Sequence, residues 1–176
     1  AAPADSAAAV AALAPAGDRK LLEALVKEAI VNFGEARQAF VAFVETHWDH
    51  AQLHEVPRLL TEVSGALRIL ALPEPGDYLI AIRQFTDREL LHRKQVPNGQ
   101  QMDRLADALA SIEYFLEALR DRRPNREQVL EVARQSLESL GYWPLTEEMR
   151  AVPLPAAPAA APIRTRHSTS AAASVP

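Results

Sequence analysis

Residues 19–44, RKLLEALVKEAIVNFGEARQAFVAFV, decide the fold class of this protein. Apolar residues recur in this stretch at three- and four-residue intervals, which is the spacing of side chains on one face of an α-helix. The residues on that face are Leu22, Leu25, Ala29, Phe33, Ala36, Phe40 and Phe43. Further apolar residues widen the face, as expected of a helix at the centre of a bundle. We expect Asp18 to cap the start of this helix and Gly34 to be its one weak point.

Two more helices are predicted over the next part of the chain. Pro57 lacks an amide hydrogen and suits a first turn, so the second helix begins near Val56. Its inward residues are Leu60, Val63, Leu67 and Leu70. Residues 73–76, Pro-Glu-Pro-Gly, form a turn signal after this helix, and Asp77 caps the start of the third. The inward residues of the third helix are Leu79, Ile82, Phe85, Leu90 and Leu91.

The last two helices are bounded in the same way. The turn signal at residues 97–99 precedes a fourth helix, which Pro124 and Asn125 terminate. A fifth helix ends with Gly141 at its C-cap position. No segment alternates between apolar and polar residues as a strand would. Short connections between helices of this length predict an all-α, antiparallel bundle of about five helices.

Both ends of the chain differ sharply from the middle in composition. Ala or Pro occupies 12 of the 17 positions in residues 1–17 and 10 of the 13 in residues 151–163. Such segments carry too little apolar bulk to offset the entropy of ordering them, and proline favours extended spacers. We therefore expect Ala/Pro-rich linkers at residues 1–17 and 150–176, with a helical module at residues 18–149 cut from a longer protein. The first residues also lack the basic start of a secretory signal.

Composition excludes several classes of function. The chain has 176 residues and no cysteine, which excludes disulfide scaffolds, Cys-ligated zinc and thiol catalysis. A formal net charge of −4 argues against an electrostatic nucleic-acid binder. No apolar run is long enough to cross a membrane. We expect a cytoplasmic protein with no cofactor, no nucleic-acid partner and no membrane partner.

The histidines do not predict a metal or catalytic site. His47, His50 and His54 fall close together, but at a helix junction, where their imidazoles are not expected to converge. His92 lies among basic residues at a helix end, where a cation suits the helix dipole. Neither a glycine-rich phosphate loop nor a Ser-His-Asp arrangement can be assigned. The basic cluster at Arg120, Arg122, Arg123 and Arg126 is interpreted as a solvated turn.

One face of the second helix is the candidate functional surface. Its residues are spaced by three and four and lie opposite the apolar stripe: His54, Arg58, Thr61, Gly65 and Arg68. A glycine inside a helix costs about 1 kcal/mol relative to alanine. Either another protein approaches the bare backbone closely at Gly65, or a neighbouring helix of the same chain packs tightly against it.

Two stretches resemble known signalling proteins. Residues 59–72, LLTEVSGALRILAL, resemble the phosphoacceptor helix of histidine phosphotransfer (HPt) domains, whose pattern is His-x-x-Lys-Gly followed by a small residue. Thr61 then lies at the histidine, Ser64 at the lysine and Gly65 at the glycine. Residues 105–142, LADALASIEYFLEALRDRRPNREQVLEVARQSLESLGY, are similar to the N-terminal part of the CheA-like hybrid histidine kinases of the type IV pilus chemotaxis system, the ChpA/PilL family. Members of that family carry several HPt-type modules on Ala/Pro-rich linkers ahead of a kinase core.

The departures from the HPt pattern decide what the resemblance implies. Threonine cannot form the labile N–P bond of a phosphohistidine, and Ser64 supplies no cation for a phosphoryl group. The resemblance therefore implies a non-catalytic pseudo-HPt module of a two-component hybrid kinase that controls type IV pili and twitching motility. It would dock or space a response-regulator receiver, another signalling protein or its neighbouring domains, through the face that includes Thr61, Ser64 and Gly65.

Three alternatives stay open at this point. Thr61 could itself accept phosphate, or the chain could be an unrelated helical adaptor with a groove for a partner helix. A kinase phosphoacceptor region needs an exposed His followed by an acidic residue, and only His54-Glu55 qualifies. The module lacks an ATP-binding part of its own, although the parent chain could be a histidine kinase.

Overall fold

The computed structural model describes residues 16–151. In order, the helices are α2 (Ala16–Glu45), the 3-10 helix η1 (His50–Leu53), α3 (Val56–Ile69), α4 (Pro73–Phe85), the π-helix η2 (Thr86–His92), α5 (Gly99–Arg120), the 3-10 helix η3 (Arg126–Val129), α6 (Leu130–Leu140) and α7 (Glu147–Arg150). These residues contain no strand, which confirms the all-α class. Most of the predicted linkers, at residues 1–17 and 150–176, lies outside the described residues; Ala16 and Gly17 belong to α2 and Arg150 to α7.

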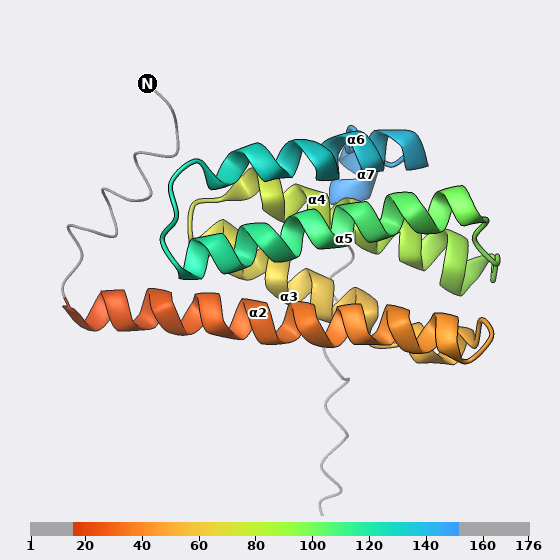
Figure 1. Ribbon diagram of the computed structural model, residues 1–176, viewed down its shortest axis with the longest axis horizontal. Helices are drawn as coiled ribbons and strands as arrows, with labels where there is room; N and C mark the ends of the chain where they lie inside the picture. Colours follow the sequence, from red (N-terminus) through yellow and green to blue (C-terminus); the bar gives the residue numbers. More distant parts are fainter. Residues whose placement is uncertain (1–15, 152–176) are drawn as a thin grey trace, which may run out of the picture.

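The main helices form a closed ring around one core. α3 packs between α2 and α4, α5 packs between α2 and α6, and α6 contacts α4 to complete the ring. Consecutive main helices run in opposite directions, with α2 along one edge of the bundle (Figure 1). The predicted antiparallel bundle of about five helices is therefore confirmed. Within residues 16–151 no helix has the combined length and apolar character of a bilayer-crossing segment.

The predicted apolar stripes supply the core. Phe33, Phe40 and Phe43 of α2 belong to one buried cluster with Phe85 of α4 and Phe115 of α5. Burial of such rings supplies most of the driving force for helices to associate. The second helix begins at Val56 with Pro57 in its first turn, as predicted.

Two predicted caps are wrong. α2 begins at Ala16, so Asp18 lies inside its first turn, where a carboxylate favours the helix dipole. α4 begins at Pro73, so the predicted turn of residues 73–76 is itself the first helical turn. Two prolines fit there because the first amide groups of a helix have no intrahelical acceptor. Asp77 is consequently not a cap.

The turn before α5 and the glycine after α6 lie where they were predicted, whereas α5 already ends at Arg120, before Pro124. Asn98 caps α5 with its side chain and forms a reciprocal capping box with Gln101. Gly141 ends α6 with a φ of 81°, a conformation that favours glycine.

α4 is the most enclosed helix of the bundle. Every residue from Tyr78 to Ile82 is buried, and so is Arg83. The segment after α6 covers the side that α3 and α6 leave open. The Trp143 ring lies tilted against the Tyr78 ring with centroids 4.6 Å apart, and Gln84 Nε2 donates to the Met149 carbonyl at 3.1 Å. This covering segment carries no amphipathic signal in the sequence.

Candidate functional site

Burial of one side of α3 determines which side of the helix faces outward. Leu60, Val63 and Leu67 have no exposed surface. The opposite side therefore faces outward, and we call it the α3 face. Its members are Arg58, Thr61, Glu62, Gly65, Arg68 and Ile69.

Thr61 is exposed, as predicted, but its hydroxyl is engaged on both sides. Thr61 Oγ1 donates to the Pro57 carbonyl at 2.7 Å and accepts from Arg83 Nη1 at 2.9 Å. An activated nucleophilic hydroxyl gives its proton to a nearby base such as an imidazole or a carboxylate. Here the proton points to a backbone carbonyl instead, so this geometry does not activate Thr61 for attack on a phosphoryl group.

Arg83 is the residue that the sequence reasoning missed at this site. Its side chain is buried beneath Thr61, and its Nε has no hydrogen-bond partner among the described residues. Burial lowers the pKa of this guanidinium, and nearby Asp87 acts in the opposite direction. Burial likewise raises the pKa of the Asp87 carboxyl. An arginine directly after Ile80, Ala81 and Ile82 was the available signal, because a lone cation in such a run is unusual.

The two arginines of the α3 face are already paired with carboxylates. Arg58 contacts Glu55 at 2.7 Å and Glu62 at 2.9 Å, while Arg68 contacts Asp77 at 2.8 Å. The pairing with Arg58 lowers the pKa of the Glu55 carboxyl. An incoming phosphate would therefore compete with these carboxylates. The face is a mixed-charge surface and not a cationic cradle.

Ser64 does not belong to the exposed face. It is buried, and its Oγ donates to the Gly76 carbonyl at 2.9 Å across the contact between α3 and α4. Its position on the helix turns it toward α4, since residues three and four apart, and not neighbours, share a face. Ser64 is therefore a packing residue, and its inclusion in the predicted docking surface is wrong.

Gly65 lies on the α3 face with open space in front of it. A Cβ placed on Gly65 would meet no heavy atom within 4 Å, so tight packing of a neighbouring helix does not explain this glycine. Beside it lies a shallow groove of about 260 Å³ between α2 and α3. The groove is lined by Leu25, Glu28, Ala29, Asn32, Glu62, Gly65, Ala66 and Ile69. The α3 face therefore leaves the helix backbone at Gly65 uncovered by the rest of the described chain.

His54 lies between η1 and α3. It is the exposed C-cap residue of η1, and α3 begins two residues later at Val56. His50 contacts the Gln95 carbonyl through Nε2 at 3.0 Å and lies against the ring of Phe43. Within residues 16–151 no three His, Cys, Asp or Glu side chains are grouped so that they could hold a metal ion.

The basic cluster near the end of α5 is also paired. Arg120 and Arg123 both contact Asp121, Arg122 contacts Glu23 of α2 at 2.9 Å, and Arg126 lies near Glu127. The pair between Arg122 and Glu23 joins the turn after α5 to the first part of α2. Such exposed ion pairs contribute little to stability, and the carboxylates offset the positive charge.

Comparisons with known proteins match this bundle to one family. The family model of the FimL C-terminal domain matches residues 18–137. The scaffold protein FimL of Pseudomonas aeruginosa is 30% identical over 118 residues, which is 66% of this chain and 21% of that protein. The chain thus spans about a fifth of the length of this curated relative. No solved structure matches the chain.

Proposed function

The chain belongs to the FimL C-terminal domain family, and from this premise we propose that it is a non-catalytic scaffold module. In this proposal it serves a chemotaxis-type two-component system that controls type IV pili and twitching motility. The name of the Pseudomonas relative, a scaffold protein, supports the scaffold role. The resemblance of residues 59–72 and 105–142 to HPt-type modules supports the signalling context. Residues 18–149 form the proposed module, between linkers that join it to other parts of a longer protein.

The engagement of the Thr61 hydroxyl is the observation that carries the non-catalytic part. The position that corresponds to a phosphoacceptor holds a hydroxyl whose proton is bound to the Pro57 carbonyl and whose lone pair is bound to Arg83. The position that corresponds to the family's lysine holds buried Ser64. Neither a labile acceptor nor an exposed cation is present at the two matching positions.

Docking through the α3 face is the second part of the proposal. Gly65 exposes helix backbone on that face, and the groove toward α2 lies directly beside it. A response-regulator receiver is the proposed partner, because receivers dock on the phosphoacceptor helix of the HPt domains that this helix resembles. Loss of the relay chemistry leaves this docking function intact.

A binding experiment tests the docking part. The chain is titrated with the receiver domains of the response regulators encoded with it, and affinity is measured by calorimetry. Gly65→Arg places a long side chain over the bare backbone, and we expect it to weaken binding at least tenfold, or about 1.4 kcal/mol. Ala110→Arg is the matched control, because it adds the same side chain at an exposed position of α5. Equal binding by the chain and both variants would overturn docking through this face.

A transfer experiment tests the non-catalytic part. The chain is incubated with a radiolabelled phospho-receiver and with the phosphorylated kinase core of the same system. We expect no label on the chain, since its hydroxyl is not activated. Acid-stable label that disappears in Thr61→Val would overturn this part and favour Thr61 as an acceptor. Label that survives in Thr61→Val but disappears in His54→Ala would favour the kinase phosphoacceptor alternative.

A further inference from the structure

A stripe of exposed residues follows the outward side of α2, away from the bundle core. Its positions are spaced alternately by four and three residues, the spacing of side chains along one side of a helix. They are Lys20, Ala24, Lys27, Val31, Gly34, Gln38, Val41 and Glu45, and we call them the α2 stripe. All eight are exposed.

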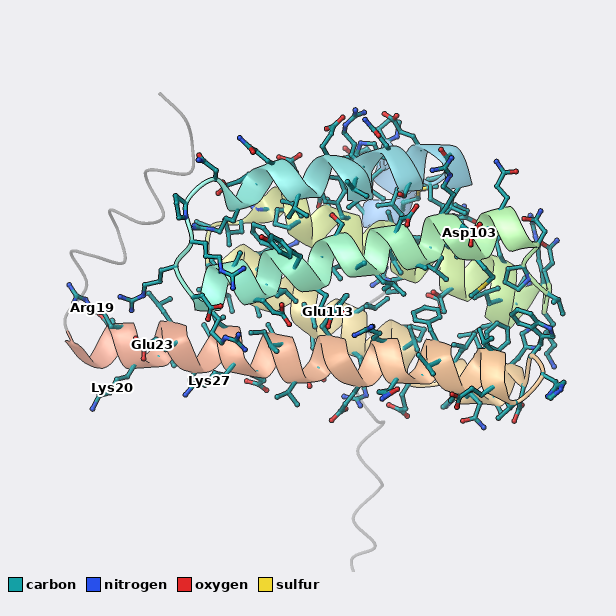
Figure 2. All side chains as sticks on the ribbon, in the orientation of Figure 1. Arg19, Lys20, Glu23, Lys27, Asp103 and Glu113 are labelled. Carbon is teal, nitrogen blue, oxygen red and sulfur yellow. The ribbon has the colours of Figure 1, made fainter. Side chains whose placement is uncertain are left out.

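The fold leaves the α2 stripe uncovered. α2 packs against α3, η1 and α5 and lies along the edge of the bundle (Figure 1). Figure 2 shows Lys20 and Lys27 directed away from the other helices. Val31 is 58% exposed and Val41 41% exposed. A second helix laid along this side would remove the apolar surface of both valines from water.

The α2 stripe of one copy is complementary to the α2 stripe of a second copy that runs in the opposite direction. When two copies of α2 are centred opposite each other at residue 36, Val31 of one copy lies opposite Val41 of the other. Gly34 then lies opposite Gln38, and Lys27 lies opposite Glu45. Each of these three layers occurs twice, because a two-fold axis relates the copies. The spacing also pairs the two core positions of a heptad, as antiparallel coiled coils require.

Within the described part of the chain, the structure leaves the charges of one layer unpaired and leaves open space at another. Lys27 and Glu45 form no ion pair among residues 16–151, so both charges are available to the second copy. A Cβ placed on Gly34 would meet no heavy atom within 4 Å, and a surface hollow of about 440 Å³ lies beside Gly34, Gln38 and Val41. That hollow gives room for the Gln38 side chain of the second copy.

We propose that two copies of this chain associate through antiparallel α2 stripes. The valine layers remove apolar surface from water, and the Lys27–Glu45 pairs at the two ends set the register and the direction. A parallel arrangement would place Lys27 against Lys27 and Glu45 against Glu45, which repel. This surface is separate from the α3 face, so the dimer does not depend on the proposed function.

Charge reversal tests the register. The mass of the 176-residue chain is measured by light scattering from about 1 μM to about 1 mM, a range that spans the affinity of a small interface. We expect a rise from 19.3 kDa toward twice that mass. Lys27→Glu and Glu45→Lys alone shift the midpoint at least fivefold to higher concentration, and the double variant restores it. Glu28→Lys, which changes charge on another side of α2, is the control and leaves the midpoint unchanged.

Crosslinking tests the direction, since the chain has no cysteine of its own. In the proposed dimer Val31→Cys of one copy meets Val41→Cys of the other, whereas two Val31→Cys sites lie about 15 Å apart along the helix. A mixture of the two variants should form a disulfide-linked dimer that neither forms alone. Any of four results would overturn the proposal. The chain could stay a monomer at every concentration, the single charge reversals could leave the midpoint unchanged, the double variant could fail to restore it, or Val31→Cys could crosslink with itself.

Discussion

Replacement of Gly65 by alanine is the sharpest test of how the α3 face is used. Gly65 lies well inside α3, where glycine loses more backbone entropy on folding than any other residue. A Cβ at this position meets no heavy atom within 4 Å, so the added methyl group causes no clash. Nothing within the described chain opposes the substitution. We therefore expect Gly65→Ala to stabilise the protein.

The expected gain is set by helix propensity. Glycine in a helix interior is less favourable than alanine by about 1 kcal/mol, and a compatible Gly→Ala change typically recovers about 0.4 to 1 kcal/mol. For a chain of this size such a gain raises the melting temperature by about 1 to 4 °C. Urea titration followed by circular dichroism measures the free energy, and a thermal scan measures the melting temperature.

Two other glycines provide the controls. Gly34 is equally open in α2, so Gly34→Ala should give a similar gain at low protein concentration. Gly76 is crowded: a Cβ there lies 3.3 Å from the Ser64 carbonyl oxygen and 3.4 Å from Ser64 Oγ. Gly76→Ala should lower stability. If Gly65→Ala lowered it as Gly76→Ala does, Gly65 would be a packing residue, and the argument for close approach by a partner would fail.

Further measurements test the interior. Ser64→Ala removes the hydrogen bond that joins α3 to α4, and urea titration should show a loss of about 1 kcal/mol; no loss would show that this bond is not stabilising. Arg83→Met removes a buried cation whose Nε has no partner among the described residues, so the urea midpoint should stay level or rise, and a marked fall would contradict this. Asn98→Ala breaks the capping box of α5 and should lower the free energy of unfolding by about 1 kcal/mol in the same titration. An unchanged free energy would show that the capping box does not stabilise the protein. Burial raises the pKa of Tyr142. The contribution of the neutral Tyr142 side chain to the free energy of unfolding is therefore complete below about pH 10, the ordinary pKa of tyrosine, and is lost as the pH rises further. Urea midpoints should therefore fall above that pH, and Tyr142→Phe should reduce the fall; an equal fall in the variant would assign it to other groups.

The α3 face shows how much of a candidate site a periodic pattern can predict. Spacing alone placed Thr61, Gly65 and Arg68 outward, and all three lie on the outer side of α3. The same spacing could not show that Ser64 hydrogen-bonds across to Gly76, because that contact depends on how closely α4 crosses α3.

Arg83 illustrates the opposite case: its position after an apolar run is an unusual feature of the sequence, but that feature does not predict its contact with Thr61. Its helix is enclosed by α3, by α6 and by the segment after α6, which removes the outward side that a cation would otherwise occupy. Its bond to Thr61 joins residues that are 22 positions apart. No repeat in either helix encodes such a contact.

Helical periods, prolines and glycines by themselves determined the number, order and approximate bounds of the main helices, because these signals act within a few residues. They also determined which side of α2 and of α3 turns toward the core. Only the tertiary structure decided that the Thr61 hydroxyl is held by a buried arginine, that Ser64 is interior and that Gly65 is open. Those outcomes depend on which helices become neighbours, and neighbours are chosen by the packing of the whole core.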